Sequence, residues 1–426
     1  MERLFQKITT RYGAIPILVL SILFMGSCGI MDVENPNSLT EEDVSIPSSA
    51  NGLKNGVLSA LMTGTGWTYA SISTVSDEIY WTGSYESYKT YNEGRVAFEE
   101  NEITVAGYPE ISEARYMSDL AVTRLEEFDS NGELNDRSIL VRTYIYAALT
   151  RITIADTYDN FVFSDGRETS PPIGEENMSQ LYDQAISMLN EAVSISREIE
   201  NETYEMQALG VRARAKHAKG VWEKLNPKGD VPQDPLVSGT GASDDAEAAL
   251  DLMTQDYKAQ FNYNEPQLQN YLANQVNSRG EITLSDPFDD IKTGEEDPRV
   301  VDIQEDFEDI GTYTENYSPL TWLSAREMRL IIAEEAVGTN DTEARNQINA
   351  VRALDGLPDM ELTDTNFEEF IEHERRANLY LQGRRLNDMY RFGSQSDNWL
   401  SGEDALETPG ILLPIPANER LANPDV

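Results

Sequence analysis

Apolar residues recur three and four positions apart along much of the chain, which is the spacing that puts them on one face of a helix. The clearest example covers residues 181–193. Asn177 and Gln180 stand just before this segment and are predicted to cap the helix at its N-terminus. The predicted apolar face consists of Leu181, Tyr182, Ala185, Ile186, Leu189, Ala192 and Val193.

A second helix has recognisable signals at both ends. Asn340 or Asp341 is placed to begin it, and Gly356 and Pro358 are placed to end it. The predicted buried face of this helix carries Ala344, Ile348 and Val351.

A third helix is predicted to open at Thr365. Glu368 follows three residues later, the spacing at which two side chains bond each other's backbone donors. Strand signals are sparse and short, so the chain is predicted to be mainly α-helical. Five more segments mix small and large apolar residues at helical spacing: residues 53–62, 111–128, 138–158, 206–225 and 322–337.

Helix pairs separated by short turns are typical of tetratricopeptide-like repeats, although the usual period of about 34 residues is not kept. Residues 227–319 are richer in Pro, Gly, Ser, Asp and Asn. Within them only residues 246–257 and 266–276 are predicted to be helical. We interpret residues 227–319 as an insertion or long-loop region on a helical frame.

The first 28 residues have the layout of a secretion signal. Basic residues precede an apolar segment, residues 15–24, which is much shorter than the roughly 20 residues that cross a bilayer. Small residues occupy the two positions before Cys28, the only cysteine of the chain. This arrangement resembles a bacterial lipobox, which implies a signal peptide of residues 1–27 and a lipid on Cys28. An ordinary secretory peptide is the alternative.

The chain is strongly acidic, with a formal net charge of -42 at pH 7. Such a charge repels nucleic acid and anionic membrane surfaces. We therefore expect no nucleic-acid partner, and contact with the membrane through the lipid anchor only. Because there is one cysteine, no internal disulfide can form, and the stability has to come from a packed core.

Seven landmarks, in order along the chain, resemble the SusD/RagB-like family of surface lipoproteins. The strongest is Glu374-Arg375-Arg376-Ala377-Asn378-Leu379 followed by Gly383-Arg384-Arg385-Leu386-Asn387-Asp388-Met389-Tyr390-Arg391. The others are residues 32–40, residues 181–193 with 211–222, Asp297-Pro298-Arg299, residues 322–336, residues 346–353 with 356–358, and Leu413-Pro414-Ile415-Pro416 with Asn423-Pro424.

The resemblance implies a mainly α-helical SusD-like body with tetratricopeptide-like helix pairs, long loops and few short strands. It also implies a nutrient-binding protein of the cell surface that serves a SusC-like TonB-dependent transporter and is not an enzyme. The expected organisation is a single SusD-like domain, residues 28–426, with an N-terminal helical part (28–226), the loop-rich insertion (227–319), and C-terminal repeat helices with a tail (320–426).

The chain departs from the family pattern in its last long helix. Asn378 and Gln382 stand where the family usually has glutamates, and Leu386 replaces a common aromatic residue. We expect the two amides to hydrogen-bond the arginines there. The charged residues of this segment are predicted to brace helix packing rather than bind a ligand: Arg375, Arg376, Arg385, Asp388 and Arg391.

Aromatic residues gather between Trp67 and Tyr91, among glycines, hydroxyls, amides and carboxylates. Flat rings on a loop stack on the apolar face of a sugar, while polar neighbours bond its hydroxyls. The same rings suit a peptide or a transporter rim, and rings that fall in helices are expected in the core. In the family, ligand contacts come from loops after the first helices and from the inserted region, where Tyr257 and Tyr263 also lie. The candidate ligand-binding residues are Tyr80, Trp81, Tyr85, Tyr88, Tyr91, Asn92, Tyr313 and Tyr317.

Signals for catalysis are few. The only histidines, His217 and His373, form no HExxH motif, and the chain has no GxSxG motif and no complete phosphate loop. We therefore expect no catalytic residues, no cofactor and no metal site. Residues 129–132 begin like a calcium loop but lack its spacing, and we interpret them as a turn between two helices.

The sequence leaves different functions open. The first is a lipid-anchored protein of the outer membrane, facing the cell surface, that passes an oligosaccharide, or a peptide, to a SusC-like transporter. The second is a helical-repeat interaction lipoprotein that binds only peptide or protein partners. A lipid-anchored glycoside hydrolase is a third, because paired carboxylates abound in a chain with 75 acidic residues.

Overall fold

The computed structural model describes residues 45–164, 169–264, 268–308 and 316–426. Residues 47–426 form one compact unit, which we consider by itself. The predicted signal peptide, the lipidation site Cys28, the landmark at residues 32–40 and the candidate Tyr313 lie outside the described residues.

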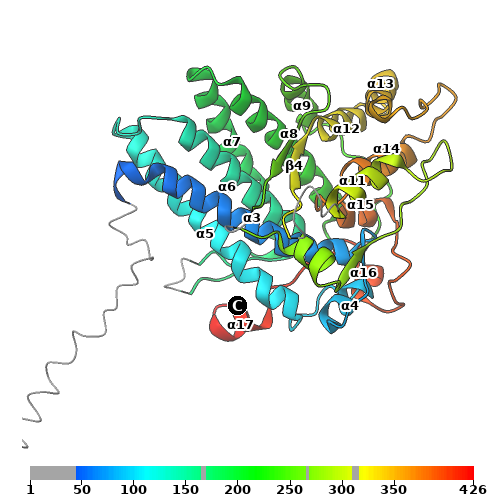
Figure 1. The fold of residues 1–426 in the computed structure, drawn as a ribbon, viewed down its shortest axis with the longest axis horizontal. Helices are drawn as coiled ribbons and strands as arrows, with labels where there is room; N and C mark the ends of the chain where they lie inside the picture. The colour runs from blue at the N-terminus through cyan, green and yellow to red at the C-terminus, as the bar shows by residue number, and fades with distance from the viewer. Residues whose placement is uncertain (1–44, 165–168, 265–267, 309–315) are drawn as a thin grey trace, which may run out of the picture. The chain divides into compact units, whose positions relative to one another are not determined.

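The described residues are mainly helical, with short strands in two separate two-stranded sheets (Figure 1). This confirms the predicted fold class. The longer helices are α3 (Ala50–Val75), α5 (Glu102–Ser130), α6 (Ser138–Thr157), α7 (Gln180–Glu198), α8 (Glu202–Leu225), α11 (Pro298–Glu308), α12 (Ala325–Ala336), α13 (Asp341–Arg352) and α14 (Phe367–Asn378). Shorter helical pieces are η3 (Pro47–Ser49), α4 (Glu86–Asn92), η4 (Glu175–Asn177), α9 (Ala242–Leu250), α10 (Tyr271–Ala273), η5 (Asn274–Ser278), η6 (Ala353–Asp355), α15 (Arg385–Phe392), α16 (Asp404–Glu407) and α17 (Ala417–Ala422). The strands are β1 (Ile79–Trp81), β2 (Lys258–Phe261), β3 (Ile282–Leu284) and β4 (Leu320–Ser324).

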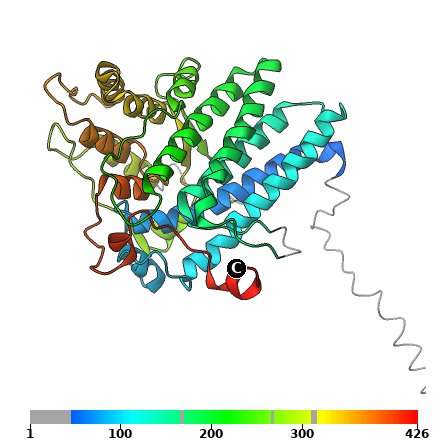
Figure 2. The same ribbon diagram turned by 180° about the vertical axis from the view of Figure 1, so that it is seen from behind.

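Long helices pack against their neighbours in chain order. Helices α5, α6, α7 and α8 follow one another side by side, with α3 against α5 and α6 (Figures 1 and 2). Only residues 199–201 join α7 to α8, and only residues 337–340 join α12 to α13. Because each helix buries its apolar face on the next, these are helix pairs of the tetratricopeptide-like kind.

Helix α7 buries the predicted apolar face, and Leu181 and Leu189 are completely inaccessible. The predicted cap is wrong, however. Asn177 belongs to η4, and its Oδ1 accepts from Nε2 of Gln180 (3.1 Å) instead of from an amide of α7. The backbone carbonyl of Ser179 receives the first amides of the helix.

The predicted N-terminal caps of two C-terminal helices have different outcomes in the structure. Asn340 caps α13 as predicted, because its side chain accepts a backbone N–H of the first turn at 3.3 Å. The predicted capping box at Thr365 and Glu368 is wrong. Helix α14 begins at Phe367, so Asn366 precedes it, and no side-chain cap bond forms there.

The helix predicted for residues 322–337 begins later than predicted, because Trp322 lies in strand β4. This strand pairs antiparallel with β2, and the rings of Trp322 and Phe261 stack with their centroids 6.1 Å apart. Ser324 then caps α12 by accepting the backbone N–H of Glu327 (3.1 Å). A partner strand about 60 residues away in sequence therefore overrides the local helical pattern.

Helix α3 is much longer than the predicted residues 53–62 and includes Trp67. Its second half is rich in Gly, Ser and Thr, which interrupt the apolar pattern. These small residues allow a close approach of α5, since a Cβ atom on Gly64 would lie 2.9 Å from Cα of Ile111. The hydroxyl of Thr68 donates to the carbonyl four residues earlier (2.7 Å), so it is satisfied inside the core.

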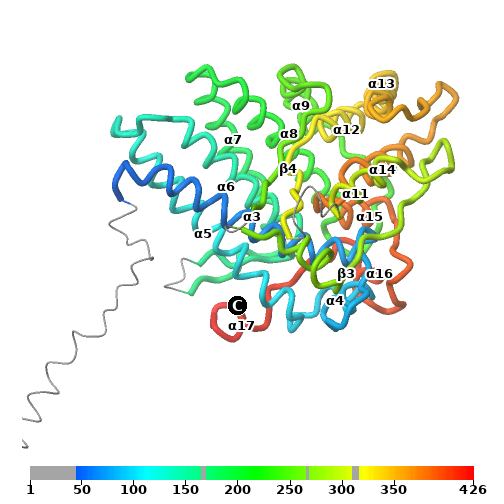
Figure 3. The backbone as a smooth tube through the Cα atoms, viewed as in Figure 1, coloured from blue at the N-terminus to red at the C-terminus, as the bar shows by residue number. Residues whose placement is uncertain are grey.

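Residues 227–319 contain more regular structure than the pattern predicts. Helix α9 ends at Leu250 rather than at residue 257, and α11, which the pattern does not predict, begins at Pro298. Strand β3 also lies here and pairs with β1, with Leu284 opposite Ile79. Figure 3 shows β3 at the end of the unit that carries α4.

The predicted turn at residues 129–132 is confirmed, because α5 ends there and Gly132 adopts a positive φ of 71°. Helix α5 starts nine residues before its predicted start at residue 111, and α6 agrees with its prediction to one residue. None of the described helices combines the length and the apolar character needed to cross a bilayer.

The arginine-rich C-terminal segment braces the helices, as predicted. Arg391 of α15 is completely buried, donates to Glu334 of α12 (Nη2 to Oε2, 3.1 Å) and bonds Asp388 (Nε to Oδ1, 2.8 Å). Further ion pairs join Arg375 to Asp388, and both Arg376 and Arg385 to Asp77.

The two amides that were predicted to hydrogen-bond arginines, Asn378 and Gln382, behave differently. Asn378 accepts from the guanidinium of Arg326 (3.1 Å), as predicted. The side chain of Gln382 instead donates through Nε2 to the backbone carbonyl of Asn378 (3.0 Å). Among the described residues, Arg384 donates to the backbone carbonyl of Gln382 and not to its side chain. Leu386 is buried at this junction and contributes to the core.

Candidate ligand-binding surface

One carboxylate fixes the loop that joins β1 to α4. Oε2 of Glu281 accepts the backbone amides of Ser84 (2.7 Å) and Tyr85 (2.9 Å). Burial opposes ionisation, but these amides outweigh it and lower the pKa of Glu281. Gly83 leaves room for this contact, because a Cβ atom there would lie 2.5 Å from Cα of Glu281. The loop is therefore held in one conformation by a residue far away in sequence.

Four rings and one guanidinium gather beside this loop. The rings of Trp67 and Tyr271 stack with centroids 3.4 Å apart and planes 15° apart. Tyr88 and Tyr271 share a hydrogen bond between their hydroxyls (3.3 Å). The guanidinium of Arg279 lies over the ring of Tyr85, 5.4 Å from its centroid. We call these five residues the aromatic cluster: Trp67, Tyr85, Tyr88, Tyr271 and Arg279.

Burial separates the members of the cluster by what they can touch. Tyr85 is 36% exposed, Arg279 is exposed, and Trp67 and Tyr271 are half-buried, whereas Tyr88 is completely inaccessible. Only the first four can reach a ligand. Tyr88 contacts Tyr271 from the buried side through the hydrogen bond between their hydroxyls. Burial raises the pKa of Tyr88, so its hydroxyl stays protonated.

The predicted site residues Tyr91 and Asn92 have inward contacts. Tyr91 is completely buried, and its hydroxyl bonds that of Thr104. Asn92 is half-buried, and its Oδ1 accepts the backbone N–H of Trp81 (3.2 Å) and an amide N–H of Asn398 (3.4 Å). Tyr91 thus offers no surface to a ligand in this structure, and Asn92 holds strand β1.

Tyr80 and Trp81 project to opposite sides of β1, as consecutive strand residues do. Both are half-buried. Burial raises the pKa of Tyr80, and the carboxylates of Asp77 and Asp286 add to this effect. Lys89 lies 5.8 Å from the Trp81 ring centroid on the other side. The structure therefore does not bring these two rings onto one face.

Tyr317 lies next to α10. Its neighbour Asn316 accepts the backbone N–H of Asn270 (2.8 Å) and bonds Asn274 (2.9 Å), so this segment packs on the helix that carries Tyr271. Tyr317 itself is half-buried. It is the predicted residue from the inserted region that the structure brings near the aromatic cluster.

The other tyrosines of the inserted region have structural contacts. The hydroxyl of Tyr263 donates to the carbonyl of Met62 (2.9 Å) inside the core, and that of Tyr257 accepts from Gln207 (2.9 Å). Sequence reasoning missed Tyr271 and Arg279. Tyr271 fell in a segment predicted to be helical, where a ring suggests core, and no local pattern marks Arg279.

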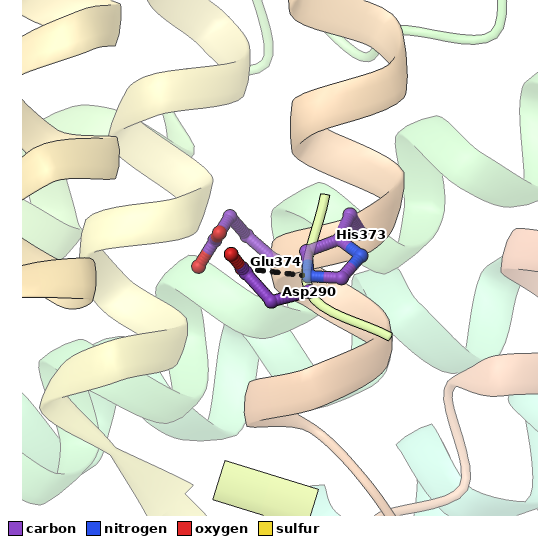
Figure 4. A group of neighbouring side chains, drawn as sticks. All are labelled: Asp290, His373 and Glu374. Carbon is purple, nitrogen blue, oxygen red and sulfur yellow. Dashed lines mark ion pairs between the residues drawn. The ribbon is translucent and has the colours of Figure 1, made fainter. Parts of the chain in front are cut away.

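A buried group of charged residues meets the geometric minimum for a metal site. Ligand atoms of Asp290, His373 and Glu374 lie within 4.8 Å of one another, and Figure 4 shows the two carboxylates turned toward each other, with an ion pair joining Asp290 to His373. Two buried guanidiniums already occupy these carboxylates. Arg352 bonds Asp290 (2.9 Å) and Glu374 (2.6 Å), and Arg299 also pairs with Glu374.

Charge balance decides how this group is interpreted. The network contains three carboxylates, Asp290, Asp297 and Glu374, and they face two arginines and His373. Burial opposes protonation of His373, but its hydrogen bonds to Asp290 and Asp297 outweigh burial and raise the pKa of His373. Protonated His373 neutralises the cluster, whereas a divalent cation would meet two fixed positive charges. We therefore interpret the group as a structural ion network.

The fold is that of a protein built from packed helix pairs, and the aromatic cluster presents partly exposed rings on it. Residues 326–426 match the SusD family. The fold is similar to a SusD-like carbohydrate-binding protein of Bacteroides vulgatus, with a TM-score of 0.59, 15% identity, and coverage of 90% of this chain and 97% of the other. It is also similar to a SusD superfamily protein of Bacteroides fragilis, with a TM-score of 0.62, 15% identity, and coverage of 90% and 99%.

A further similar structure was solved with a xylogluco-oligosaccharide, and it has a TM-score of 0.56, 13% identity, and coverage of 88% of this chain and 97% of the other. No curated protein matches the chain. The family match over residues 326–426 and the shared fold confirm the resemblance to SusD/RagB-like proteins seen in the sequence.

Proposed function

We propose that this protein binds a nutrient oligosaccharide at the aromatic cluster. The observation that carries the proposal is the exposed ring of Tyr85 on a loop held by Glu281, with Tyr271 and Arg279 beside it. A ring fixed in this way stacks on a sugar face at little cost in conformational entropy. The structures solved as a carbohydrate-binding protein and with a xylogluco-oligosaccharide share the fold and support this ligand class.

The predicted site residues have different parts in this proposal. Tyr85 is a direct contact, and the half-buried Tyr317 lies near it. Tyr80 and Trp81 remain proposed contacts, but they project to opposite sides of β1 and so cannot both lie beside Tyr85. Tyr88, Tyr91 and Asn92 position the surface from beneath. Tyr313 remains a proposed contact from the inserted region.

The rest of the proposed function concerns delivery. The protein passes its ligand to a SusC-like TonB-dependent transporter and catalyses no reaction itself. A lipid on Cys28 holds residues 28–426, acting as one domain, on the cell-surface side of the outer membrane. The family match to residues 326–426 supports this role, and the acidic charge of the chain agrees with contact to the membrane through the lipid alone.

The ligand class is tested on glycan and peptide arrays with a soluble form that lacks residues 1–28. This form retains the whole compact unit of residues 47–426. We expect binding to a neutral oligosaccharide such as a xyloglucan fragment, and no binding to peptides. Binding to peptides alone would replace the proposal with a peptide- or protein-binding function.

Tyr85→Ala is expected to weaken oligosaccharide binding about tenfold. Loss of one stacking contact costs roughly 1–2 kcal/mol. The ring is 36% exposed and its neighbours are Tyr88 and Arg279, so the melting temperature should change little. Isothermal titration calorimetry and thermal unfolding measure the two quantities on the same sample.

The matched control is Tyr116→Ala, which removes a half-buried tyrosine of α5 outside the aromatic cluster. This variant should bind the oligosaccharide at wild-type strength. Wild-type affinity of the Tyr85 variant, at normal stability, would place the ligand elsewhere on the protein.

Cys28→Ser is expected to abolish membrane anchoring, because Cys28 is the only residue that can carry the lipid. The precursor should stay unlipidated and appear in the soluble or secreted fraction. Fractionation of cells with metabolic labelling by a palmitate analogue gives the measurement. A Cys28→Ser protein that is still processed and retained in the membrane would contradict the lipobox assignment.

A further inference from the structure

A second, polar groove lies between α11 and the β2–β4 sheet, and none of the candidate ligand-binding residues that the structure describes lines it. It consists of two adjoining hollows of about 170 Å³ and 330 Å³. Both hollows are lined by Lys258, Ile303, Asp306, Thr321 and Gln382, so they share one wall.

The walls follow from strand and helix periodicity. In β2, Ala259 and Phe261 face the core, so Lys258 and Gln260 face the groove. Helix α11 contributes two pairs of residues to the groove, and the two residues of each pair are four positions apart on the helix. One pair is acidic, Asp302 and Asp306, and the other is apolar, Ile303 and Phe307.

The floor is formed by the segment after α14. Gln382 is 5% exposed and lines both hollows. Its Nε2 donates to the carbonyl of Asn378 (3.0 Å), whereas its Oε1 has no hydrogen-bond partner among the described residues. A buried acceptor without a partner is costly, and here it faces a space that a ligand can enter.

The unpaired charge in the groove is mainly negative. Asp302 and Asp306 are exposed and form no ion pair within the described part of the chain. The groove's other acids, Asp256 and Asp355, share Arg326. Among the lining residues that the structure describes, the positive charge without an ion pair is Lys258, which is exposed. Acceptors therefore outnumber donors, and the apolar pair lies beside them.

We propose that this groove binds an organic cation, an alkylammonium or alkylguanidinium group. The cationic head donates to Asp302, Asp306 and Oε1 of Gln382, and its carbon chain lies along Ile303, Phe307 and Leu320. The net charge of -42 also attracts cations to the protein. The group belongs either to a free diamine or to a lysine or arginine side chain of a peptide.

The test is isothermal titration calorimetry of the full-length protein in detergent. The probes are 1,5-diaminopentane, agmatine, and a lysine tripeptide with blocked ends. Pentane-1,5-diol is the neutral control, and glutarate is the anionic control. We expect the cations to bind and the diol and glutarate not to bind. Binding of the diamine and agmatine without the tripeptide assigns a free amine, and binding of the tripeptide assigns a peptide side chain.

Two exposed residues give variants with opposite expected signs. Asp306→Asn should weaken binding of the cation roughly tenfold, since it removes a charged acceptor. Lys258→Gln should strengthen it several-fold, because a like charge is lost from the rim. Asp230→Asn, an exposed acid outside the groove, should change nothing.

The opposite results overturn the proposal. Binding of pentane-1,5-diol as strong as that of the diamine would be one such result, and weaker binding of the diamine by Lys258→Gln than by the wild type would be another. Displacement of the diamine by stoichiometric Ca²⁺ would make the groove a metal site. Both groove variants change exposed side chains, so their melting temperatures should match the wild type. If Asp306→Asn had a lower melting temperature than the wild type, the change in cation affinity of Lys258→Gln alone would decide between the outcomes. Oligosaccharide binding at the aromatic cluster should be unaffected in both.

Discussion

Glu334→Gln should destabilise the protein by about 3–5 kcal/mol, the usual cost of removing one partner from a buried ion pair. Glu334 is completely buried, and its carboxylate bonds Arg391, His217 (2.9 Å) and the backbone amide of Val237 (2.8 Å). Burial opposes its ionisation, but Arg391 and His217 hold the pKa of Glu334 well below its usual range. The substitution keeps the size of the side chain, so the loss measures charge and not a cavity.

Glu198→Gln is the matched control for this substitution. Glu198 pairs with Arg137 (2.6 Å), but its side chain is 56% exposed. Surface pairs contribute roughly 0–1 kcal/mol, so little change is expected. Chemical denaturation of both variants gives the free energies of unfolding. Equal free energies of unfolding for the two variants would show that the buried network does not hold α12 to α15.

The free energy of unfolding should fall as the pH rises from about 4.5 to 7, by up to about 3 kcal/mol from one residue. Burial raises the pKa of Glu78 from 4.5 to about 7, against the hydrogen bonds from Ser73 and Leu381. In this window the unfolded chain releases the proton and the folded chain keeps it. The folded state therefore loses stability at about 1.4 kcal/mol per pH unit.

Titration of His373 also lowers the free energy of unfolding as the pH rises, but over a higher pH range than titration of Glu78. The folded pKa of His373 is raised above 6.5, so the stability that His373 contributes is complete below that pH and is lost as the pH passes its folded pKa. Carboxylates with lowered pKa values, such as Asp77, act oppositely and lose their contribution in acid. Maximum stability is therefore expected in mildly acidic solution.

Glu78→Gln separates the contribution of Glu78 from the rest. The amide cannot ionise, so the fall between pH 4.5 and 7 should shrink, and the variant should be more stable than the wild type at pH 8. Thermal and urea unfolding at pH 5, 6, 7 and 8 provide the comparison. A wild-type pH profile for Glu78→Gln would mean that this carboxyl titrates normally in the folded protein.

Helix positions were the most predictable feature, because an apolar face is a local property of the sequence. The faces of α7 and α13 and the bounds of α6 agree with the structure. Errors occurred where a helix is packed through small residues, as in the second half of α3, or where a distant strand competes, as at Trp322. In both cases the deciding contacts join segments far apart in the chain.

The candidate site was predictable only in part. The sequence pointed to the loop around Tyr85, but it could not tell that Tyr88 and Tyr91 turn inward, since burial depends on what packs above them. Tyr271 and Arg279 entered the site through tertiary contacts alone. The groove beside α11 was not predicted either, because the pattern did not show that helix.

The sequence by itself determined the class of the fold, the order of its main helices and the bracing role of the C-terminal arginines. The fold class and the helix order follow from periodicity, which acts within a few turns of chain. The bracing role follows from charged residues at helical spacing, although their partners Asp77 and Glu334 lie far away in the sequence. Only the tertiary structure decided which rings are exposed and what holds them. Glu281 fixes the loop at Ser84 from 197 residues away, and no local pattern records a contact of that length.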